Sequence, residues 1–384
     1  MRTIYLDHST TTPLAGSVRE GMLPFLGEHF ADPSSHHWMG RVSFEAMEDA
    51  RNAVATLLHC HPSEIYFTSS GTESINLALL GAAQEIENGL GPGAEPHMII
   101  SAIEHLAVSR CAESLQKRGW KVTRIGCNDQ SVVKLDHLES SLRESTRLIS
   151  IMHVNHEIGT VQPIRHLREL CDQREILLHT DACQSVGKLR CDLEQLQVDL
   201  LSLSSHKMYG PKGVGALYVR NGIAIQPIIH GEYQESGLRP GMENVAGIAG
   251  LGQAARLAQD GQVDILDRLQ TLADRFLNRL EQALPSQVHL HGRRAERLPS
   301  ILSLEFIGKS ARAIVAKCPE LCLGPVGHEG RSDSYLGMAT TLAAMGVTPV
   351  SADSTIRISL GWTTTDEEVD RAAEILAHAC ESAS

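Results

Sequence analysis

The chain has 384 residues, enough for two domains at about 150 residues each, and 42% of them are hydrophobic. Its 34 Lys and Arg against 46 Asp and Glu give a net charge of −12, and this lack of a basic excess disfavours nucleic-acid binding. The nine cysteines form no CxxC pair, and the sequence has neither an apolar signal segment nor a membrane span, so we expect a cytoplasmic protein with reduced thiols and no membrane partner.

Short aliphatic and β-branched runs alternate with helical patterns through the N-terminal half of the chain. The predicted strands are Glu64–Thr68, Met98–Ser101, Leu148–His153, Ile176–His179 and Asp199–Ser204, and the predicted helices include Asn76–Ile86 and Ile164–Arg174. This alternation indicates βαβ units, and therefore an α/β fold with a mostly parallel central sheet flanked by helices. Such open sheets bind ligands at the carboxyl ends of their strands.

The C-terminal part has a different pattern. Its predicted elements are an amphipathic helix over Leu266–Leu284, strands over Gln287–Leu290 and Ser300–Phe306, and a final helix from Asp366. Thr365 and Glu368 have the spacing of a capping box at the start of that last helix. We expect a large α/β domain over residues 14–255 and a small α+β domain formed by residues 1–13 and 256–384.

Three segments at predicted strand ends carry polar residues. In Thr68–Glu73, small hydroxylated residues and a glycine begin a helix, where unpaired N–H groups and the helix dipole suit a phosphate. Asp181 ends a buried strand and needs a cationic or donor partner, which a protonated pyridine nitrogen would supply. Lys207 ends another strand before a glycine-rich turn, a setting that suits Schiff-base formation. Taken singly, the three also fit a helix cap, a capping Asp and an exposed loop lysine.

Together the three segments meet the needs of pyridoxal 5'-phosphate, which are a phosphate cup, an acid for the ring nitrogen and a lysine for the aldehyde. With these residues in place, the sequence resembles the cysteine desulfurase and selenocysteine lyase group, the class V branch of fold-type I pyridoxal phosphate enzymes. The matching motifs, in order, are Tyr5–Pro13, Asp32–His36, Thr68–Asn76, Glu104-His105, His153–Gly159, His179–Gln184, Ser204–Gly215, Arg239–Gly241 and Arg357–Gly361. The resemblance implies a fold-type I architecture, an amino-acid substrate and a homodimer.

The resemblance also assigns roles to single residues. It implies that Lys207 carries the cofactor as a Schiff base and moves the Cα proton, that His105 stacks on the ring and assists proton transfer, and that Asp181 keeps the ring nitrogen protonated. The further cofactor-binding residues would be Gln184 at the phenolic oxygen and Gly71, Thr72, Ser204 and His206 at the phosphate. Asn155 and Arg357 would bind the substrate carboxylate, Arg357 as a bidentate pair. No metal site is expected, because the histidine pairs lack convergent further ligands.

The chain departs from this family in a loop near its C-terminus. Desulfurases carry a loop cysteine that attacks the substrate sulfur, whereas this loop consists of Gly327, His328, Glu329, Gly330, Arg331, Ser332 and Asp333. Matching its last two residues to the family places Gly330 at the cysteine position, and a glycine cannot form a persulfide. Met242 also stands where the family has a threonine donated by the partner subunit, and Trp362 replaces an arginine.

We therefore predict cleavage of a Cβ–S or Cβ–Se bond of a cysteine-type amino acid by β-elimination. The products would be pyruvate, ammonia and a thiol, in place of alanine and a persulfide. His328, Glu329 or Arg331 would be the candidates for leaving-group acid or substrate clamp, although each also fits a solvated loop residue.

Two alternatives remain at this point. The first is a true desulfurase or selenocysteine lyase that uses another thiol, Cys318 or Cys322, or an external acceptor such as a sulfur-accepting protein. The second is a non-catalytic, cofactor-binding scaffold. The joint presence of Lys207, Asp181 and Arg357 argues against a scaffold.

Overall fold

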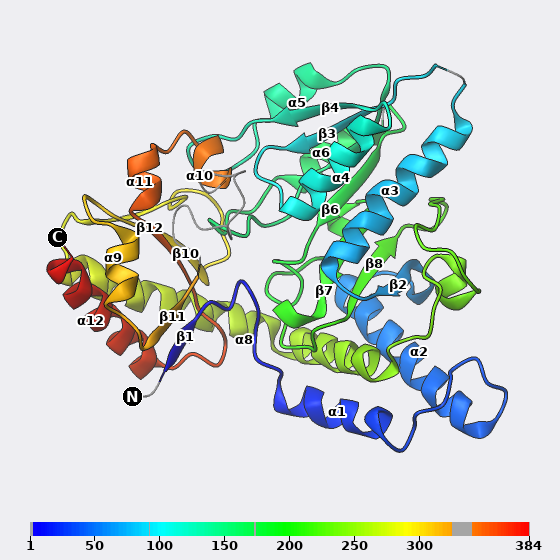
Figure 1. Cartoon of the computed structure of the whole chain (residues 1–384), viewed down its shortest axis with the longest axis horizontal. Coiled ribbons are helices and arrows are strands. Elements are labelled where there is room, and N and C mark those ends of the chain that lie inside the picture. The colour runs from blue at the N-terminus through cyan, green and yellow to red at the C-terminus, as the bar shows by residue number, and fades with distance from the viewer. Residues whose placement is uncertain (1–2, 92, 173, 325–339, 384) are drawn as a thin grey trace.

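A computed structural model describes residues 3–91, 93–172, 174–324 and 340–383 (Figure 1). The large sheet contains, in spatial order, β2 (Ile65–Thr68), β8 (Gly215–Val219), β7 (Leu200–Ser204), β6 (Leu177–Asp181), β5 (Thr146–Ser150), β3 (His97–Ser101) and β4 (Lys121–Ile125). A second sheet consists of β12 (Thr355–Ser359), β10 (Ile301–Phe306) and β9 (Val288–Leu290), and β1 (Ile4–Leu6) pairs with β11 (Leu321–Leu323). In the large sheet β8 is antiparallel to both of its neighbours and the other pairs are parallel, so the mostly parallel α/β sheet is confirmed.

Helices cover both faces of the large sheet. The helices of the described chain are α1 (Gly16–Leu26), α2 (Trp38–Leu58), α3 (Gly71–Gly89), α4 (Leu106–Lys117), α5 (Leu135–Ser141), α6 (Ile164–Asp172), α7 (Leu193–Leu196), α8 (Val245–Ala283), α9 (Ala311–Ala316), α10 (Thr340–Ala344), α11 (Pro349–Asp353) and α12 (Asp366–Ser382). Of these, α9 and α12 pack in a second apolar cluster with β10 and β12. Three short 3-10 turns are η1 (Pro62–Glu64), η2 (Ser205–Lys207) and η3 (Gln234–Gly237). No described helix is both long and apolar enough to cross a membrane.

Alternating side chains of the strands build separate cores on the two faces. On β3, Met98 and Ile100 pack with α3 and α4, whereas Ile99 belongs to the cluster that includes α2, α6 and the first half of α8. The alternation follows from the period of two along a strand. Because both faces are covered, the inner strands β3, β5, β6 and β7 are buried along most of their length, and this made them recognisable in the sequence.

The long helix α8 begins at Val245, about twenty residues before the predicted start. The sequence did not predict the first turns of α8 because glycines and alanines dominate them and do not form a stripe of large apolar side chains. These small residues serve close packing instead: a Cβ on Gly252 would lie 2.5 Å from the Cα of Ala50 in α2. Tertiary packing therefore stabilises a helix that the local sequence disfavours.

One helix connects two apolar clusters. The first half of α8 packs with the large sheet, and its second half packs with β10, β12, α12 and the N-terminal strand β1 (Figure 1). The capping box at α12 forms as predicted, with Thr365 accepting from the Glu368 amide and Glu368 accepting from the Thr365 amide. The proposed division between residues 255 and 256 falls inside α8 and stays a prediction.

Candidate active site

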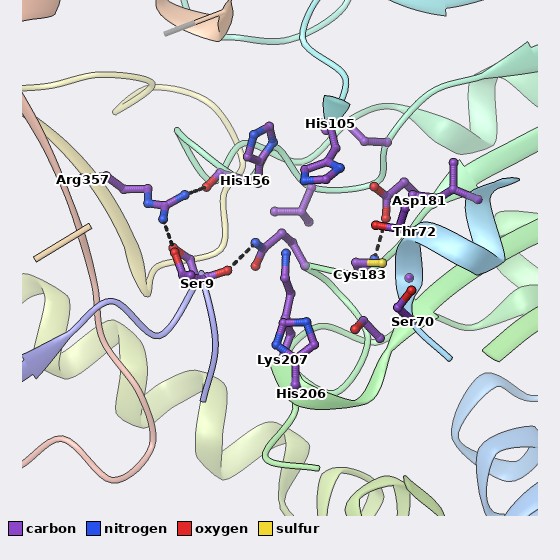
Figure 2. A pocket seen from close by; sticks show the side chains of 17 residues that line it. Ser9, Ser70, Thr72, His105, His156, Asp181, Cys183, His206, Lys207 and Arg357 are labelled. Atoms are coloured by element: carbon purple, nitrogen blue, oxygen red, sulfur yellow. Dashed lines mark hydrogen bonds between the residues drawn. The ribbon is translucent and has the colours of Figure 1, made fainter. Parts of the chain in front are cut away.

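A cavity of about 340 Å³ lies where the parallel strands of the large sheet end (Figure 2). Its lining side chains follow the carboxyl ends of β2, β3, β5, β6 and β7, and the N-terminal segment and β12 complete it. The lining consists of Ser9, Thr10, Ser70, Gly71, Thr72, Ile75, His105, Met152, Val154, His156, Asp181, Cys183, Gln184, Ser204, His206, Lys207 and Arg357. All but one of the site residues proposed within the described chain therefore meet in one cavity, the exception being Asn155.

The start of α3 forms one end of this cavity. Helix α3 begins at Gly71, and the first amides of a helix lack intrahelical acceptors. A Cβ on Gly71 would lie 2.5 Å from the Sγ of Cys183, so only glycine fits there without a shift. The Oγ of Ser204 is buried, lines the same cavity and has no hydrogen-bond partner within the described residues. A helix start and an unsatisfied hydroxyl match the oxygen acceptors of a phosphate.

Lys207 and His206 stand on η2, directly after β7. The N-terminal segment anchors this turn, because the Oγ of Thr12 donates to the His206 carbonyl and accepts from the Tyr209 amide. The His206 ring lies 3.1 Å from the Thr11 hydroxyl, and burial, followed by the charge of Lys207, lowers the pKa of His206 to about 4. A neutral imidazole is thus held beside the lysine amine.

Asp181 and His105 both line the cavity and lie in the same part of it (Figure 2). The Asp181 carboxylate accepts from the Cys183 amide at 2.9 Å, which fixes its orientation at the end of β6. The Nδ1 of His105 accepts from the Ala107 amide at 3.1 Å at the start of α4, so the proton of the neutral ring lies on Nε2. Burial lowers the pKa of His105 and the nearby Asp181 opposes this, while Lys207 adds to it.

A buried lysine orients the amide of Gln184. The Nζ of Lys188 donates to the Oε1 of Gln184 at 3.2 Å, so the opposite end of the amide is the donor. That Nε2 donates to the carbonyl of Ser9 at 2.8 Å and has a second N–H at the cavity. Burial lowers the pKa of Lys188 to about 7. The free N–H of Gln184 therefore suits the anionic phenolic oxygen that the sequence resemblance assigns to this residue.

Arg357 enters the cavity from β12 and is fixed on three sides. It donates to the His156 carbonyl at 2.9 Å, to Asp7 at 3.0 Å and to the Thr10 hydroxyl at 2.6 Å. Its Nε is buried with no partner within the described residues. The guanidinium is therefore oriented in advance and retains donor capacity for a carboxylate.

Asn155 is fully buried and does not line the cavity. Its amide nitrogen donates to the Ile103 carbonyl, and its oxygen accepts from the amides of Glu157 and Ile158. In this structure Asn155 shapes the loop after β5, and its proposed contact with substrate stays a prediction.

Several lining residues had no assigned role in the sequence. Ser9 and Thr10 lie in the N-terminal motif, and His156 follows Asn155, so the motifs contained them without indicating their function. Cys183 directly precedes Gln184, and burial raises the pKa of its thiol well above the ordinary value. Only the fold shows that these side chains converge.

The altered loop from Gly327 to Arg331 lies outside the described residues, so its predicted roles have no structural counterpart here. Of the two thiols considered as replacements, Cys318 is buried in a core cluster and Cys322 is exposed on β11. Neither belongs to the described lining of the cavity.

The described residues fit pyridoxal phosphate. The helix start and Ser204 suit the phosphate, Asp181 suits the ring nitrogen, Gln184 suits the phenolic oxygen, and Lys207 suits the aldehyde. Each matching group is a donor, an acceptor or an amine that lines the same cavity.

Comparison with known proteins gives a consistent result. The family model described as aminotransferase class-V matches residues 4–372. Cysteine desulfurase IscS of Dictyoglomus turgidum is 40% identical over 375 residues, covering 98% of this chain and 94% of that protein. Cysteine desulfurase IscS of Serratia proteamaculans is 40% identical over 378 residues, covering 97% and 91%.

Solved structures share the fold over nearly the full length. A NifS-like protein superposes with a TM-score of 0.90 at 34% identity, covering 98% of both chains. SspA, solved in complex with cysteine, gives a TM-score of 0.81 at 32% identity and covers 94% of this chain and all of that one. The chain belongs to the class-V aminotransferase family, in the cysteine desulfurase branch, whose members use pyridoxal 5'-phosphate.

Proposed function

We propose that this protein cleaves the Cβ–S bond of a cysteine-type amino acid, or the Cβ–Se bond of its selenium analogue, by β-elimination. The proposal is supported by the cavity that the described residues line, together with the motif match that places Gly330 at the family's cysteine position. The residues for cofactor and carboxylate are present, whereas the thiol that would take the sulfur is replaced. The expected products are pyruvate, ammonia and a free thiol or selenol.

Residues of the chain divide the work. When bound, pyridoxal phosphate supplies an electron sink for the charge that develops at Cα. Arg357, held by Asp7 and Thr10, binds and orients the substrate carboxylate. The Nζ of Lys207 takes the Cα proton, and Asp181 holds a proton at the ring nitrogen. Loss of the Cα proton leaves negative charge at Cα, and this charge expels the sulfur or selenium substituent from Cβ.

Product analysis tests the proposal. The purified holoenzyme is incubated with cysteine, cystine and cysteine S-conjugates, and mass spectrometry scores pyruvate against alanine. Pyruvate is expected with an equal amount of the released sulfur compound, which is sulfide from cysteine, thiocysteine from cystine and a thiol from an S-conjugate. The Lys207→Ala variant serves as the inactive control. Alanine together with a persulfide on the protein would overturn the proposal.

A true desulfurase is the second candidate, favoured by the relatives that are named cysteine desulfurases. It would need another thiol or an external acceptor, such as a sulfur-accepting protein. Cys322 is exposed on β11, where it pairs with Tyr5 of β1. Separate Cys322→Ser and Cys318→Ser variants decide this case, because a thiol that receives sulfur is required for sulfide release.

A further inference from the structure

We infer that the imidazole of His156, supported by Glu157, gives a proton to the sulfur that leaves Cβ. The protein would then supply its own acid for the leaving thiol from the loop after β5. This inference rests on the proposed β-elimination and names the group that assists it.

The position of His156 points to this role. Its side chain lines the cavity between Arg357 and His105 (Figure 2). The rings of His156 and His105 lie 5.4 Å apart in an edge-to-face arrangement, and the carbonyl of His156 accepts from Arg357 at 2.9 Å. Arg357 would bind the substrate carboxylate and Lys207 would act at Cα. The His156 ring lies beside Arg357, so it would lie next to the β-substituent of a substrate bound in this way.

The ring of His156 has unused hydrogen-bonding capacity. Its Nδ1 is buried and has no hydrogen-bond partner within the described residues. Its Nε2 lies 3.8 Å from the Oε1 of Glu157, too far for a hydrogen bond but close enough for an ion pair once the ring is protonated. The carboxyl of Glu157 is held by the Thr341 amide at 3.3 Å. The acid and its supporting carboxylate therefore come from consecutive residues.

The surrounding charges explain when the ring gains its proton. Burial, followed by His105, Lys207 and Arg357, holds the pKa of His156 well below its ordinary value before substrate binds. A substrate carboxylate at Arg357 adds a negative charge beside the ring, which favours the imidazolium. Burial raises the pKa of Glu157, while the Thr341 hydrogen bond and Arg357 lower it, and its carboxylate, when ionised, can pair with the imidazolium 3.8 Å away. Substrate binding would thus favour protonation of His156 before the Cβ–S bond breaks.

The atoms and electrons of the step balance. Lys207 takes the proton from Cα, the Cβ–S bond breaks with its electron pair on sulfur, and His156 transfers its proton to that sulfur. The imidazole is left neutral, and water releases the three-carbon product as pyruvate and ammonium. No oxidant or reductant is consumed.

The acidity of the leaving thiol provides a sharp test. A poor leaving group, as in S-ethylcysteine, needs an acid, whereas a nitrophenyl thiolate leaves without one. His156→Asn should lower kcat for S-ethylcysteine by about 100-fold, within the usual range for general acid catalysis, and lower kcat for the S-nitrophenyl conjugate only slightly. An equal loss with both substrates, or no loss with either, would overturn the inference.

The control is His59→Asn, the same change at the exposed C-cap of α2. His59 has a left-handed backbone with φ of 56°, which asparagine also adopts, so both rates should stay at the wild-type level. The cofactor absorbance of each variant verifies folding and loading. If the wild type itself yields alanine and persulfide, the proposed function fails, and this outcome is distinct from an equal loss in His156→Asn.

Binding of a substrate without a leaving group gives a second readout. Calorimetry of L-alanine binding to the holoenzyme, in two buffers of different ionisation enthalpy, counts the protons taken up. The wild type should take up more protons than His156→Asn, and Glu157→Gln should lie between them. Equal proton uptake by the wild type and His156→Asn would show that His156 does not become protonated when substrate binds, and would contradict the inference.

Discussion

Lys207 is the residue on which the chemistry depends. It lines the cavity at the end of β7, and the sequence predicts that it binds the cofactor covalently. The Lys207→Ala variant should lose the visible absorbance of the bound cofactor after dialysis and at least about 1,000-fold in pyruvate formation, since the nucleophile and base are the same amine. Lys212→Ala, an exposed lysine of the same turn, is the matched control and should keep both.

A buried carboxyl beside the cavity makes stability depend on pH. Burial raises the pKa of Glu104 to about 8, and its Oε1 accepts from the Ser101 hydroxyl and the Met152 amide. The folded state therefore holds a proton that the unfolded state releases near pH 4.5, so this group makes the protein less stable as pH rises from about 4.5 to 8. Glu104→Gln should remove that dependence.

Urea unfolding of both proteins at pH 5 and pH 8 measures this effect. The variant should gain stability relative to the wild type at the higher pH. A difference in the free energy of unfolding that is the same at both values would show that Glu104 is ionised in the folded protein.

The sequence indicated the residues of the cofactor site but not those that support them. Lys207, Asp181 and Gly71 were found because each stands at a strand end, where polar residues interrupt an apolar run. His156 and Cys183 gave no separate signal, because a single histidine or cysteine inside a motif has no periodicity. Their position depends on how five strands end together, which is a property of the sheet.

At the scale of elements, the buried pair of Arg51 and Glu235 joins α2, β2 and η3. The two side chains form two hydrogen bonds at 2.9 and 2.8 Å, and Glu235 also accepts from the Phe67 amide at 2.7 Å. Glu235→Ala would remove both of these bonds and the acceptor of the Phe67 amide, and would leave the buried guanidinium with only Glu48 and the Ile65 carbonyl, so we expect a loss of about 3 kcal/mol in the free energy of unfolding.

Chemical denaturation measures this loss, with Glu45→Ala as the control. Glu45 pairs with Arg41 on the exposed surface of α2, where an ion pair contributes little. Its variant should unfold near the wild-type midpoint. Similar midpoints for the two variants would show that the buried pair does not hold these elements together.

At the start of α3, the space around Gly71 limits which residue can stand there. Gly71→Ala places a Cβ against Cys183 and Ser204 at the predicted phosphate position. The variant should lose cofactor at least about 10-fold faster in dialysis, because the helix start must shift. Gly16→Ala, at the first residue of α1 with open space around it, should retain cofactor as the wild type does.

Elements with a strong apolar pattern were predicted, and those stabilised by partners were not. Five strands of the large sheet, β2, β3, β5, β6 and β7, and the helix α12 matched because apolar residues marked them. Strands β4 and β8 and the first half of α8 were missed. The residues of β4 are half exposed, and α8 begins with glycines whose value lies in contact with α2. Local propensity contains no information about such contacts.

At the scale of the whole molecule, we propose that two copies of the chain associate. Phe30, between α1 and α2, is 75% exposed, Trp38, the first residue of α2, is 69% exposed, and Met242 is 65% exposed. We propose that these exposed apolar side chains contribute to the interface between the two copies. Trp38→Glu combined with Phe30→Asp should convert a dimer into a monomer in sedimentation equilibrium.

The control for that experiment is Ile307→Asp, which changes another exposed apolar residue in the C-terminal part of the chain. It should remain dimeric. A wild type that sediments as a monomer would contradict the proposed association.

The most direct test of the account is the fate of sulfur in a single turnover. The wild type and Gly330→Cys are mixed with less than one equivalent of L-cysteine, and intact-protein mass spectrometry is combined with quantification of pyruvate and alanine. The account predicts pyruvate and no added sulfur for the wild type, and a shift toward alanine with protein-bound sulfur for Gly330→Cys. Alanine from the wild type in equal amount to sulfur bound on the protein would contradict it.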